Sequence, residues 1–182
     1  MQASHNLTKP HNYVILILQK TEGKIYFMYN HKPALCFDMD GTIVDFYSFP
    51  NWLDNLQMKL VGPYLHADPL GNMRTLARQL NKLKKMGYKL CIVSWGSKQA
   101  SAEYLAQIRQ AKKKWLSVHL KSVHFDEICV VPYGTPKSTV CSFYDENAIL
   151  FDDEARNREE WGENSFSEKE MLEILKILGK SN

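Results

Sequence analysis

Four short runs of mostly apolar residues limit how this chain can fold more than any other feature of the sequence. The runs cover residues 34–37, 89–93, 127–131 and 148–151. Continuous apolar runs of this length are typical of strands that are buried on both faces, as in a parallel sheet. The intervening and following segments carry apolar residues at helical spacing, over about 68–87, 97–116 and from 167 onward. This alternation predicts an α/β fold with a doubly wound, mostly parallel sheet and helices on both faces.

Two of these helices carry recognisable end signals. Asp68 and Pro69 are the residue types favoured at an N-cap and at the first helical position, and Gly87 follows the last apolar residue. Ser167 and Glu170 have the spacing of a capping box. We therefore expect one helix to begin at Asp68 and another at Ser167.

The length of 182 residues suits one such domain with a short appendage. Apolar residues make up 45% of the chain and charged residues 24%, which excludes a disordered, collagen-like or coiled-coil protein. The formal net charge of +3 is too small to indicate nucleic-acid binding by itself. We divide the chain into an extension over residues 1–32 and one α/β domain over residues 33–182.

The extension contains two apolar runs, residues 13–18 and 25–29, which a turn at Glu22 and Gly23 would join into a β-hairpin. The first run has six residues, against the roughly 20 that a membrane helix needs, and no cleavage site follows it. We therefore expect no membrane association. A second interpretation takes Met28 as the true start of the protein, and the sequence does not separate the two.

The four cysteines have no metal-binding spacing. Cys36, Cys91 and Cys129 lie inside the apolar runs, Cys141 lies outside them, and no CxxC pair occurs. We interpret the first three as small buried hydrophobic residues, which fits a reducing, cytoplasmic setting.

Polar side chains follow three of the predicted strands at the point where each strand ends. Asp38 and Asp40 follow the first strand, Ser94 the second, and Asp152 and Asp153 the fourth. Ligands bind outside the carboxyl ends of the strands in such sheets, so we expect these side chains to form one site. Converging carboxylates repel one another, and a hard divalent cation would resolve the repulsion. Mg²⁺ favours a few carboxylates, retained waters and a substrate phosphate as ligands. The sequence therefore predicts a magnesium site that takes a phosphorylated substrate.

These residue types support phosphoryl transfer. An aspartate held against a phosphate by a metal can act as a nucleophile, and a carboxylate two residues further on can protonate the leaving oxygen and later activate water. Ser94 offers a hydroxyl to a phosphoryl oxygen, and Lys137 balances the negative charge. The turn at Gly41 and Thr42 offers backbone N–H groups to an anion.

The same residues resemble the four motifs of the haloacid dehalogenase (HAD) superfamily of phosphohydrolases, over about residues 34–160. The motifs are DxDGT, a hydrophobic strand that ends in Ser or Thr, a lysine, and an acidic pair after a hydrophobic strand. They match Asp38-Met39-Asp40-Gly41-Thr42, Ile92-Val93-Ser94, Lys137 and Leu150-Phe151-Asp152-Asp153. DxDGT after a strand is the specific signal, whereas the serine and lysine matches would be weak alone.

The resemblance implies a Rossmann-like, HAD-like fold and a role for each matched residue. Asp38 would be the nucleophile and a magnesium ligand. Asp40 would be the general acid and base, and would bind the metal through its backbone carbonyl. Asp152 and Asp153 would complete the metal site. Because Asp40 is present, the resemblance favours phosphate chemistry over dehalogenation.

Only 55 residues separate Asp38 from Ser94, which leaves about residues 45–66 for a cap. That length is too short for a full helical cap domain, so we expect a capless or minimally capped member of the superfamily. Trp95 and Gly96, which directly follow the second motif, would face the phosphate.

Two further stretches leave alternatives open. Residues 46–53 are unusually aromatic, and either form a wall that stacks on a ring or pack a short helix over about 52–60 onto the domain. Residues 109–121 hold five cations, which either contact a phosphate backbone or form a solvated helix face. Arg156 and Arg158 would brace the acidic pair.

These features together predict a Mg²⁺-dependent phosphomonoesterase that acts through an aspartyl-phosphate on Asp38. One alternative is a nucleotide or polynucleotide-end phosphatase, which would use the aromatic and basic stretches. The other is a binding module that keeps the fold without catalysis, against which the intact set of acids with Ser94 and Lys137 argues. The substrate, the oligomeric state and the acceptor of the phosphate stay open.

Overall fold

A parallel five-stranded sheet forms the centre of the protein. The computed structural model describes residues 32–180, and its strands are in the order β3-β2-β1-β4-β5. Their bounds are Ala34–Phe37 (β1), Lys89–Trp95 (β2), Glu127–Val131 (β3), Ile149–Phe151 (β4) and Ser165–Phe166 (β5). Every neighbouring pair of these strands is parallel. The predicted α/β class is therefore confirmed, whereas the expected hairpin and the alternative start at Met28 lie outside the described residues.

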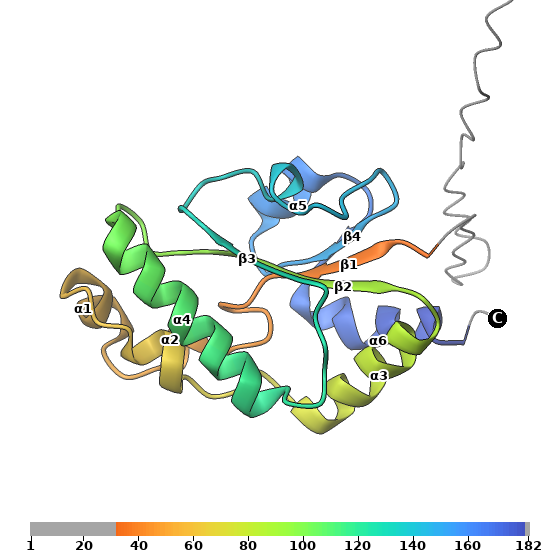
Figure 1. Cartoon of the computed structure of the whole chain (residues 1–182), viewed down its shortest axis with the longest axis horizontal. Coiled ribbons are helices and arrows are strands. Elements are labelled where there is room, and N and C mark those ends of the chain that lie inside the picture. Colours follow the sequence, from red (N-terminus) through yellow and green to blue (C-terminus); the bar gives the residue numbers. More distant parts are fainter. Residues whose placement is uncertain (1–31, 181–182) are drawn as a thin grey trace, which may run out of the picture.

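The helices cover the two faces of the sheet unequally (Figure 1). They are α1 (Trp52–Gln57), α2 (Gly62–His66), α3 (Met73–Lys85), α4 (Ala102–His119), α5 (Ala155–Trp161) and α6 (Glu168–Leu178), with the 3-10 helices η1 (Phe46–Ser48) and η2 (Lys137–Thr139). α3, α4 and α6 lie on one face of the sheet, and the shorter α5 lies on the other. None of the described helices is long and apolar enough to cross a bilayer.

The alternation of side chains along each strand divides the core in two. In β1, Leu35 and Phe37 belong to a large apolar cluster with residues of α3, α4 and α6, whereas Ala34 and Cys36 belong to a smaller cluster with Trp161 of α5. All four β1 side chains are buried. Because both faces of β1 are covered, its sequence is a continuous apolar run instead of an alternating one.

The smaller cluster brings three cysteines together. The sulfur atoms of Cys36, Cys91 and Cys141 lie within 4.8 Å of one another, and those of Cys36 and Cys141 are 3.6 Å apart. Cys36 and Cys91 are buried, as predicted, but Cys129 is only partly buried because β3 is an edge strand of the sheet. Cys141 is buried although it lies outside the strands.

The start of α3 differs from the sequence prediction. The helix begins at Met73, after the N-cap Asn72, whose side-chain oxygen accepts a hydrogen bond from the Thr75 N–H (2.9 Å). The expected N-cap, Asp68, accepts a backbone hydrogen bond from the Asp45 N–H (2.8 Å) instead. The segment around Asp68 is therefore used to hold the chain that follows β1, and the helix starts later.

Serines precede both α4 and α6. Ser101 Oγ accepts a hydrogen bond from the Tyr104 N–H (3.2 Å), so α4 begins at Ala102, later than the expected residue 97. The capping box of Ser167 and Glu170 is present as predicted. The strand β5 directly before α6 was not predicted, because two residues carry too little pattern to indicate a strand.

The segment with η1, α1 and α2 is held against α4 by two hydrogen bonds. The Trp115 Nε1–H donates to the backbone oxygen of Ala67 (2.7 Å), and the Tyr104 hydroxyl donates to that of Leu60 (2.9 Å). Trp115 is only 1% exposed, so this bond lies in the protein interior. These contacts place the segment beside the carboxyl ends of the strands, where a cap would lie.

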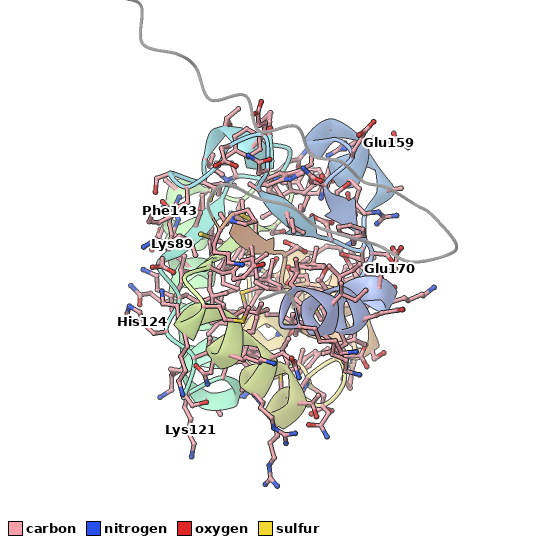
Figure 2. The ribbon with its side chains drawn as sticks, turned by 90° about the vertical axis from the view of Figure 1, so that its right-hand side faces the viewer. Lys89, Lys121, His124, Phe143, Glu159 and Glu170 are labelled. Carbon is pink, nitrogen blue, oxygen red and sulfur yellow. The ribbon has the colours of Figure 1, made fainter. Side chains whose placement is uncertain are left out.

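The basic stretch does not form one continuous surface. Arg109 Nε donates to the backbone oxygen of Val130 (2.7 Å), and the side chain of Lys112 is buried. Lys121 and His124, in contrast, point outward from the loop between α4 and β3 (Figure 2). Because two of the five cations make internal contacts, the stretch is a poor candidate for a phosphate-backbone surface.

The end of the sheet opposite the predicted site is closed by contacts around Asp126. Its carboxylate accepts a hydrogen bond from the Leu90 N–H (2.8 Å) and pairs with Lys84. Burial would raise the pKa of Asp126, but the hydrogen bonds from Lys84 and from the Leu90 N–H, together with the charges of Lys84 and Lys89, outweigh it and the pKa is lowered. Lys89 Nζ lies 5.2 Å from the ring centre of Phe143, and Figure 2 shows these two residues side by side.

Replacing Trp115 by Phe tests the attachment of the segment to α4. The Trp115→Phe substitution leaves the Ala67 carbonyl without its buried donor, so we expect the free energy of unfolding to fall by about 1–3 kcal/mol in urea titrations. Val118→Ala is the control on the same helix, because Val118 is 54% exposed and its loss should change stability by about 0.5 kcal/mol or less. Equal effects of the two substitutions would contradict the proposed role of the bond.

Candidate active site

The carboxyl ends of β1 and β4 bring the predicted acidic residues to one edge of the sheet. In the parallel register, Phe37 of β1 is paired with Ile92 of β2 and with Phe151 of β4. Asp38 and Asp152 directly follow Phe37 and Phe151, so the two carboxylates lie on neighbouring strands. The Asp38 N–H donates to the backbone oxygen of Phe151 (2.9 Å), which fixes where the first loop leaves the sheet.

Lys137 lies between two of these carboxylates. Its Nζ is 2.7 Å from Asp38 Oδ1 and 2.5 Å from Asp152 Oδ2, and its side chain is buried. Burial alone would lower the pKa of Lys137, but the charges of Asp38 and Asp152 outweigh it and the pKa is raised. Lys137 is therefore a fixed positive charge at this point.

One lysine does not neutralise the acidic residues that meet here. Carboxylate oxygens of Asp38, Asp152 and Asp153 lie within 4.8 Å of one another. Burial raises the pKa of Asp153 to about 7, and the charges of Asp38 and Asp152 act in the same direction. Burial also raises the pKa of Asp152, against the lowering effect of Lys137. The cluster thus carries excess negative charge that favours a bound cation.

The donor set of this cluster fits a hard divalent cation. All three side chains are carboxylates, the ligand type that Mg²⁺ takes in proteins. Asp38 Oδ1 is buried and, among the described residues, accepts no hydrogen bond of normal geometry although Lys137 is close. The Asp40 carboxylate is not part of the cluster. The contact expected from its backbone carbonyl stays a prediction.

Helix α5 holds the acidic pair in place. Asn157 Nδ2 donates to both carboxylate oxygens of Asp152 (3.1 Å each), and Arg158 Nη1 donates to the backbone oxygens of Asp152 and Asp153 (2.7 Å each). Arg158 braces the pair as expected, whereas Arg156 lies over the Trp95 ring, 5.0 Å from its centre. Asn157 was not predicted, although a polar residue one helical turn beyond an acidic pair is a signal that indicates such a contact.

Gly41 and Thr42 shape the first loop. The Thr42 hydroxyl donates to Asp153 Oδ1 (3.2 Å) and accepts from the Asp153 N–H (3.1 Å), so the first and fourth motifs are joined directly. The N–H groups of Gly41 and Thr42 donate to backbone oxygens of Val44 and Met39 inside the turn. The phosphate cradle expected from these two N–H groups therefore stays a prediction, and the contacts seen are structural.

A second buried lysine, which sequence reasoning missed, holds the other carboxylate of the first motif. Lys112 Nζ donates to Asp40 Oδ2 (2.8 Å), to Ser94 Oγ (2.7 Å) and to the backbone oxygen of Trp95 (2.8 Å). Burial raises the pKa of Asp40 to about 6, against the lowering effect of Lys112. Lys112 lies within the basic stretch, where its polar neighbours hide its position on the inward face of α4; its spacing from the apolar residues Ile108 and Trp115 is the signal.

Trp95 and Gly96, which follow the second motif, both donate hydrogen bonds to backbone oxygens of the protein. The Trp95 indole N–H donates to the backbone oxygen of Thr135 (2.7 Å), and the Gly96 N–H donates to that of Val131 (2.7 Å). Because Lys112 donates to Ser94 Oγ, the Ser94 hydroxyl hydrogen is left to donate to another acceptor. Contact of Trp95 and Gly96 with a phosphate stays a prediction.

A cavity of about 650 Å³ opens beside the cluster. Its wall includes the nucleophile candidate Asp38 together with Lys137 and Asp153, and it extends over the segment that contains η1 and α1. The aromatic residues of the wall are Phe46, Tyr47, Trp52, Tyr64, Trp95, Tyr104 and Tyr133. Residues 46–53 were expected either to form a wall that stacks on a ring or to pack onto the domain, and both occur. Phe46 packs into the core and is 2% exposed, whereas Tyr47 is 48% exposed at the cavity.

A comparison with solved structures supports the predicted fold, whereas sequence comparisons find no match. No family model and no curated protein matches this sequence. The solved structure of D,D-heptose 1,7-bisphosphate phosphatase from Burkholderia thailandensis is similar with a TM-score of 0.52 and 11% identity, over 82% of this chain and 100% of that chain. A target protein from Vibrio cholerae aligns with a TM-score of 0.37 and 21% identity, over 81% of this chain and 97% of that chain. This TM-score is too low to support a conclusion. The first likeness confirms the HAD-like fold.

Substitution of Gly41 tests the close approach of the first and fourth motifs. Gly41 has a φ of +80°, and a Cβ atom there would lie 2.3 Å from Asp153 Oδ2 and 2.9 Å from Tyr47 Cε2. We expect Gly41→Ala to lower the free energy of unfolding by more than the about 1 kcal/mol of backbone strain alone. Gly71→Ala is the matched control, since Gly71 has a φ of +94° with no atom within 4 Å of the added Cβ. Equal losses in urea titrations would show that the two motifs are not in contact.

Proposed function

We propose that this protein is a Mg²⁺-dependent phosphomonoesterase of the haloacid dehalogenase type, acting through an aspartyl-phosphate on Asp38. The observation that carries the proposal is the position of Asp38 beside Lys137 and two further carboxylates, at the edge of the sheet where ligands bind. The cavity that begins at Asp38 provides room for a phosphorylated substrate.

In the first step a carboxylate oxygen of Asp38 attacks the phosphorus, and the ester P–O bond breaks. The leaving oxygen takes a proton from Asp40. In the second step water attacks the phosphorus of the acyl phosphate, Asp40 accepts a proton from this water, and Asp38 is released. Lys137 offsets the negative charge of the nucleophile and of the transferred group throughout.

Asp38, Asp152 and Asp153 would hold the Mg²⁺ ion, with the backbone carbonyl of Asp40 as the further ligand that the resemblance implies. When bound, the ion would supply positive charge that brings the phosphate and the nucleophile together. Asn157 and Arg158 keep the acidic pair oriented for this purpose.

Lys112 has a separate role in the proposal. It fixes the Asp40 carboxylate and orients Ser94, whose hydroxyl hydrogen is then free to contact a phosphoryl oxygen. Each buried lysine thus pairs with one carboxylate of the first motif: Lys137 with the nucleophile Asp38, and Lys112 with the general acid and base Asp40.

A specific observation favours one of the two alternatives. The aromatic side chains that line the cavity suit a nucleotide phosphatase, because an aromatic ring can stack on a base. The non-catalytic binding module is less well supported, because buried charges are costly and this set of acids and lysines has no structural purpose that apolar residues would not serve.

The reaction class is tested with p-nitrophenyl phosphate, with and without Mg²⁺. We expect turnover that depends on Mg²⁺ in the wild-type protein and that falls to background in Asp38→Asn, because asparagine cannot attack the phosphorus. Mg²⁺ should also raise the Tm of the wild-type protein, and Asp153→Asn should diminish that rise. Turnover that survives Asp38→Asn would overturn the aspartyl-phosphate mechanism.

The role of Lys112 is tested by comparing leaving groups. In Lys112→Met we expect kcat/KM for an alkyl phosphate, which reports the steps up to release of the leaving group, to fall by about 100-fold, since Asp40 is no longer held where it protonates the leaving oxygen. The effect on p-nitrophenyl phosphate should be smaller, because p-nitrophenolate leaves without a proton.

Lys113→Met is the matched control for this comparison, since Lys113 is exposed at the next position of α4. Both rates should stay unchanged in that variant. A loss in Lys112→Met that is equal for both leaving groups would indicate a structural role only.

A further inference from the structure

The cavity has two aromatic sides that come from different parts of the chain. One side is formed by Phe46, Tyr47 and Trp52, which follow the first motif, and the other by Trp95 and Tyr133, which lie at the ends of β2 and β3. The rings within each side contact one another: Tyr47 and Trp52 have ring centres 5.2 Å apart, and Trp95 and Tyr133 have theirs 4.8 Å apart. Asp38 and Lys137 belong to the same cavity.

Two of these rings are exposed in a way that core packing does not explain. Tyr47 is 48% exposed and Tyr133 is 42% exposed, whereas Trp95 is 7% exposed. Trp95 is held by its hydrogen bond to Thr135 and lies against the Tyr133 ring. The Arg156 guanidinium lies over both rings, 5.0 Å from the centre of Trp95 and 6.0 Å from that of Tyr133, so Tyr133 rests on a fixed support and keeps 42% of its surface exposed. An exposed ring on a rigid support presents a face on which a planar group can stack.

Tyr47 lies directly beside the nucleophile loop. A Cβ atom at Gly41 would come within 2.9 Å of Tyr47 Cε2, and Gly41 lies in the loop that begins at Asp38. Burial raises the pKa of the Tyr47 hydroxyl, and the negative charge of Asp153 is the next largest cause of the increase. A group esterified to a phosphate at Asp38 would therefore meet the Tyr47 ring.

The backbone of the cavity wall is strained. Among the described residues, the non-glycine residues with positive φ are Asn51 (53°), Lys59 (55°) and Gln99 (58°). Lys59 and Gln99 line the cavity, and Asn51 directly precedes Trp52. Left-handed backbone at non-glycine residues costs free energy and clusters where ligands are bound.

Polar side chains complete the wall away from the acids. Gln57, Lys59, Lys98 and Gln99 all line the cavity. Amide groups offer both donors and acceptors, and lysines offer donors only. A ligand that has a planar ring with several polar edge atoms satisfies both the aromatic faces and these groups, which a plain phenyl ring does not.

Resting on the proposed function, we propose that the substrate is a nucleoside monophosphate, whose base is bound in this cavity by stacking on Tyr47 and Tyr133 while its phosphate meets Asp38. The bare sugar phosphate would lack the stacking contacts. A plain aryl phosphate would have the stacking contacts without the polar ones.

The test compares kcat/KM for adenosine 5′-monophosphate, uridine 5′-monophosphate, ribose 5-phosphate and phenyl phosphate in the presence of Mg²⁺. We expect at least one nucleotide to exceed ribose 5-phosphate and phenyl phosphate by about ten-fold or more, as stacking of one base predicts. Tyr133→Leu and Tyr47→Leu should each reduce the ratio of nucleotide to ribose 5-phosphate by about ten-fold.

Tyr144→Leu is the matched control. Tyr144 is 40% exposed and contacts the Trp161 ring (4.9 Å between centres), but it does not line this cavity. The ratio should stay unchanged in this variant. A ratio near one in the wild-type protein, or an equal fall in all three variants, would overturn the inference, as would phenyl phosphate matching the nucleotides.

A binding measurement separates this inference from the proposed function. Adenosine and uridine have no phosphate, and the nucleoside of the preferred nucleotide should quench the tryptophan fluorescence of Asp38→Asn protein. Tyr133→Leu in that background should weaken its binding by about ten-fold. No binding of either nucleoside would overturn the inference. Hydrolysis of ribose 5-phosphate without a preference for nucleotides would overturn only this inference, whereas no hydrolysis of any ester would overturn the proposed function.

Discussion

The ion pairs of Lys137 with Asp38 and Asp152 are the interaction on which the organisation of this protein depends. A buried carboxylate is costly unless it is paired, and here two strands end in carboxylates at the same edge of the sheet. Lys137 makes that arrangement possible, and it reaches the site from η2, outside the strands that carry the acids. The long connection between β3 and β4 is therefore part of the site and not merely a link between strands.

Much of the fold follows from local pattern in the sequence. The four apolar runs predict β1 to β4, and the capping box predicts the start of α6. β1 and β4 are buried on both faces and need no alternation, whereas β3 has the same pattern although it is only partly buried at the edge of the sheet. The start of α3 did not follow, since Asp68 has the residue type of an N-cap but pairs through its backbone with Asp45. A tertiary contact of this kind leaves no trace in local sequence.

In the candidate site, too, some residues could be predicted from the sequence and others depend on tertiary contacts. Asp38, Asp152 and Asp153 could be placed together because parallel strands bring their carboxyl ends to one edge. Lys112 was missed because it is one of three consecutive lysines, although its spacing from Ile108 and Trp115 indicates that it faces inward. Its contacts with Asp40 and Ser94 depend on how α4 packs against the sheet, which local sequence does not show. Asn157 was missed for a related reason: it matters only because α5 packs back onto the strand that ends in Asp152.

The unequal cover of the sheet has a consequence for how the site loses its order. The face with α5 has the smaller apolar cluster, and that single short helix carries Asn157 and Arg158, which hold the acidic pair. Regions with little apolar burial open locally at a lower free energy than the whole domain. Detachment of α5 would remove the hydrogen bonds of Asn157 and Arg158 from the acidic pair while the large cluster on the other face stays intact. We therefore expect the acidic pair to lose this support by local opening of α5 before the domain unfolds, which amide hydrogen exchange along α5 would report separately from global unfolding.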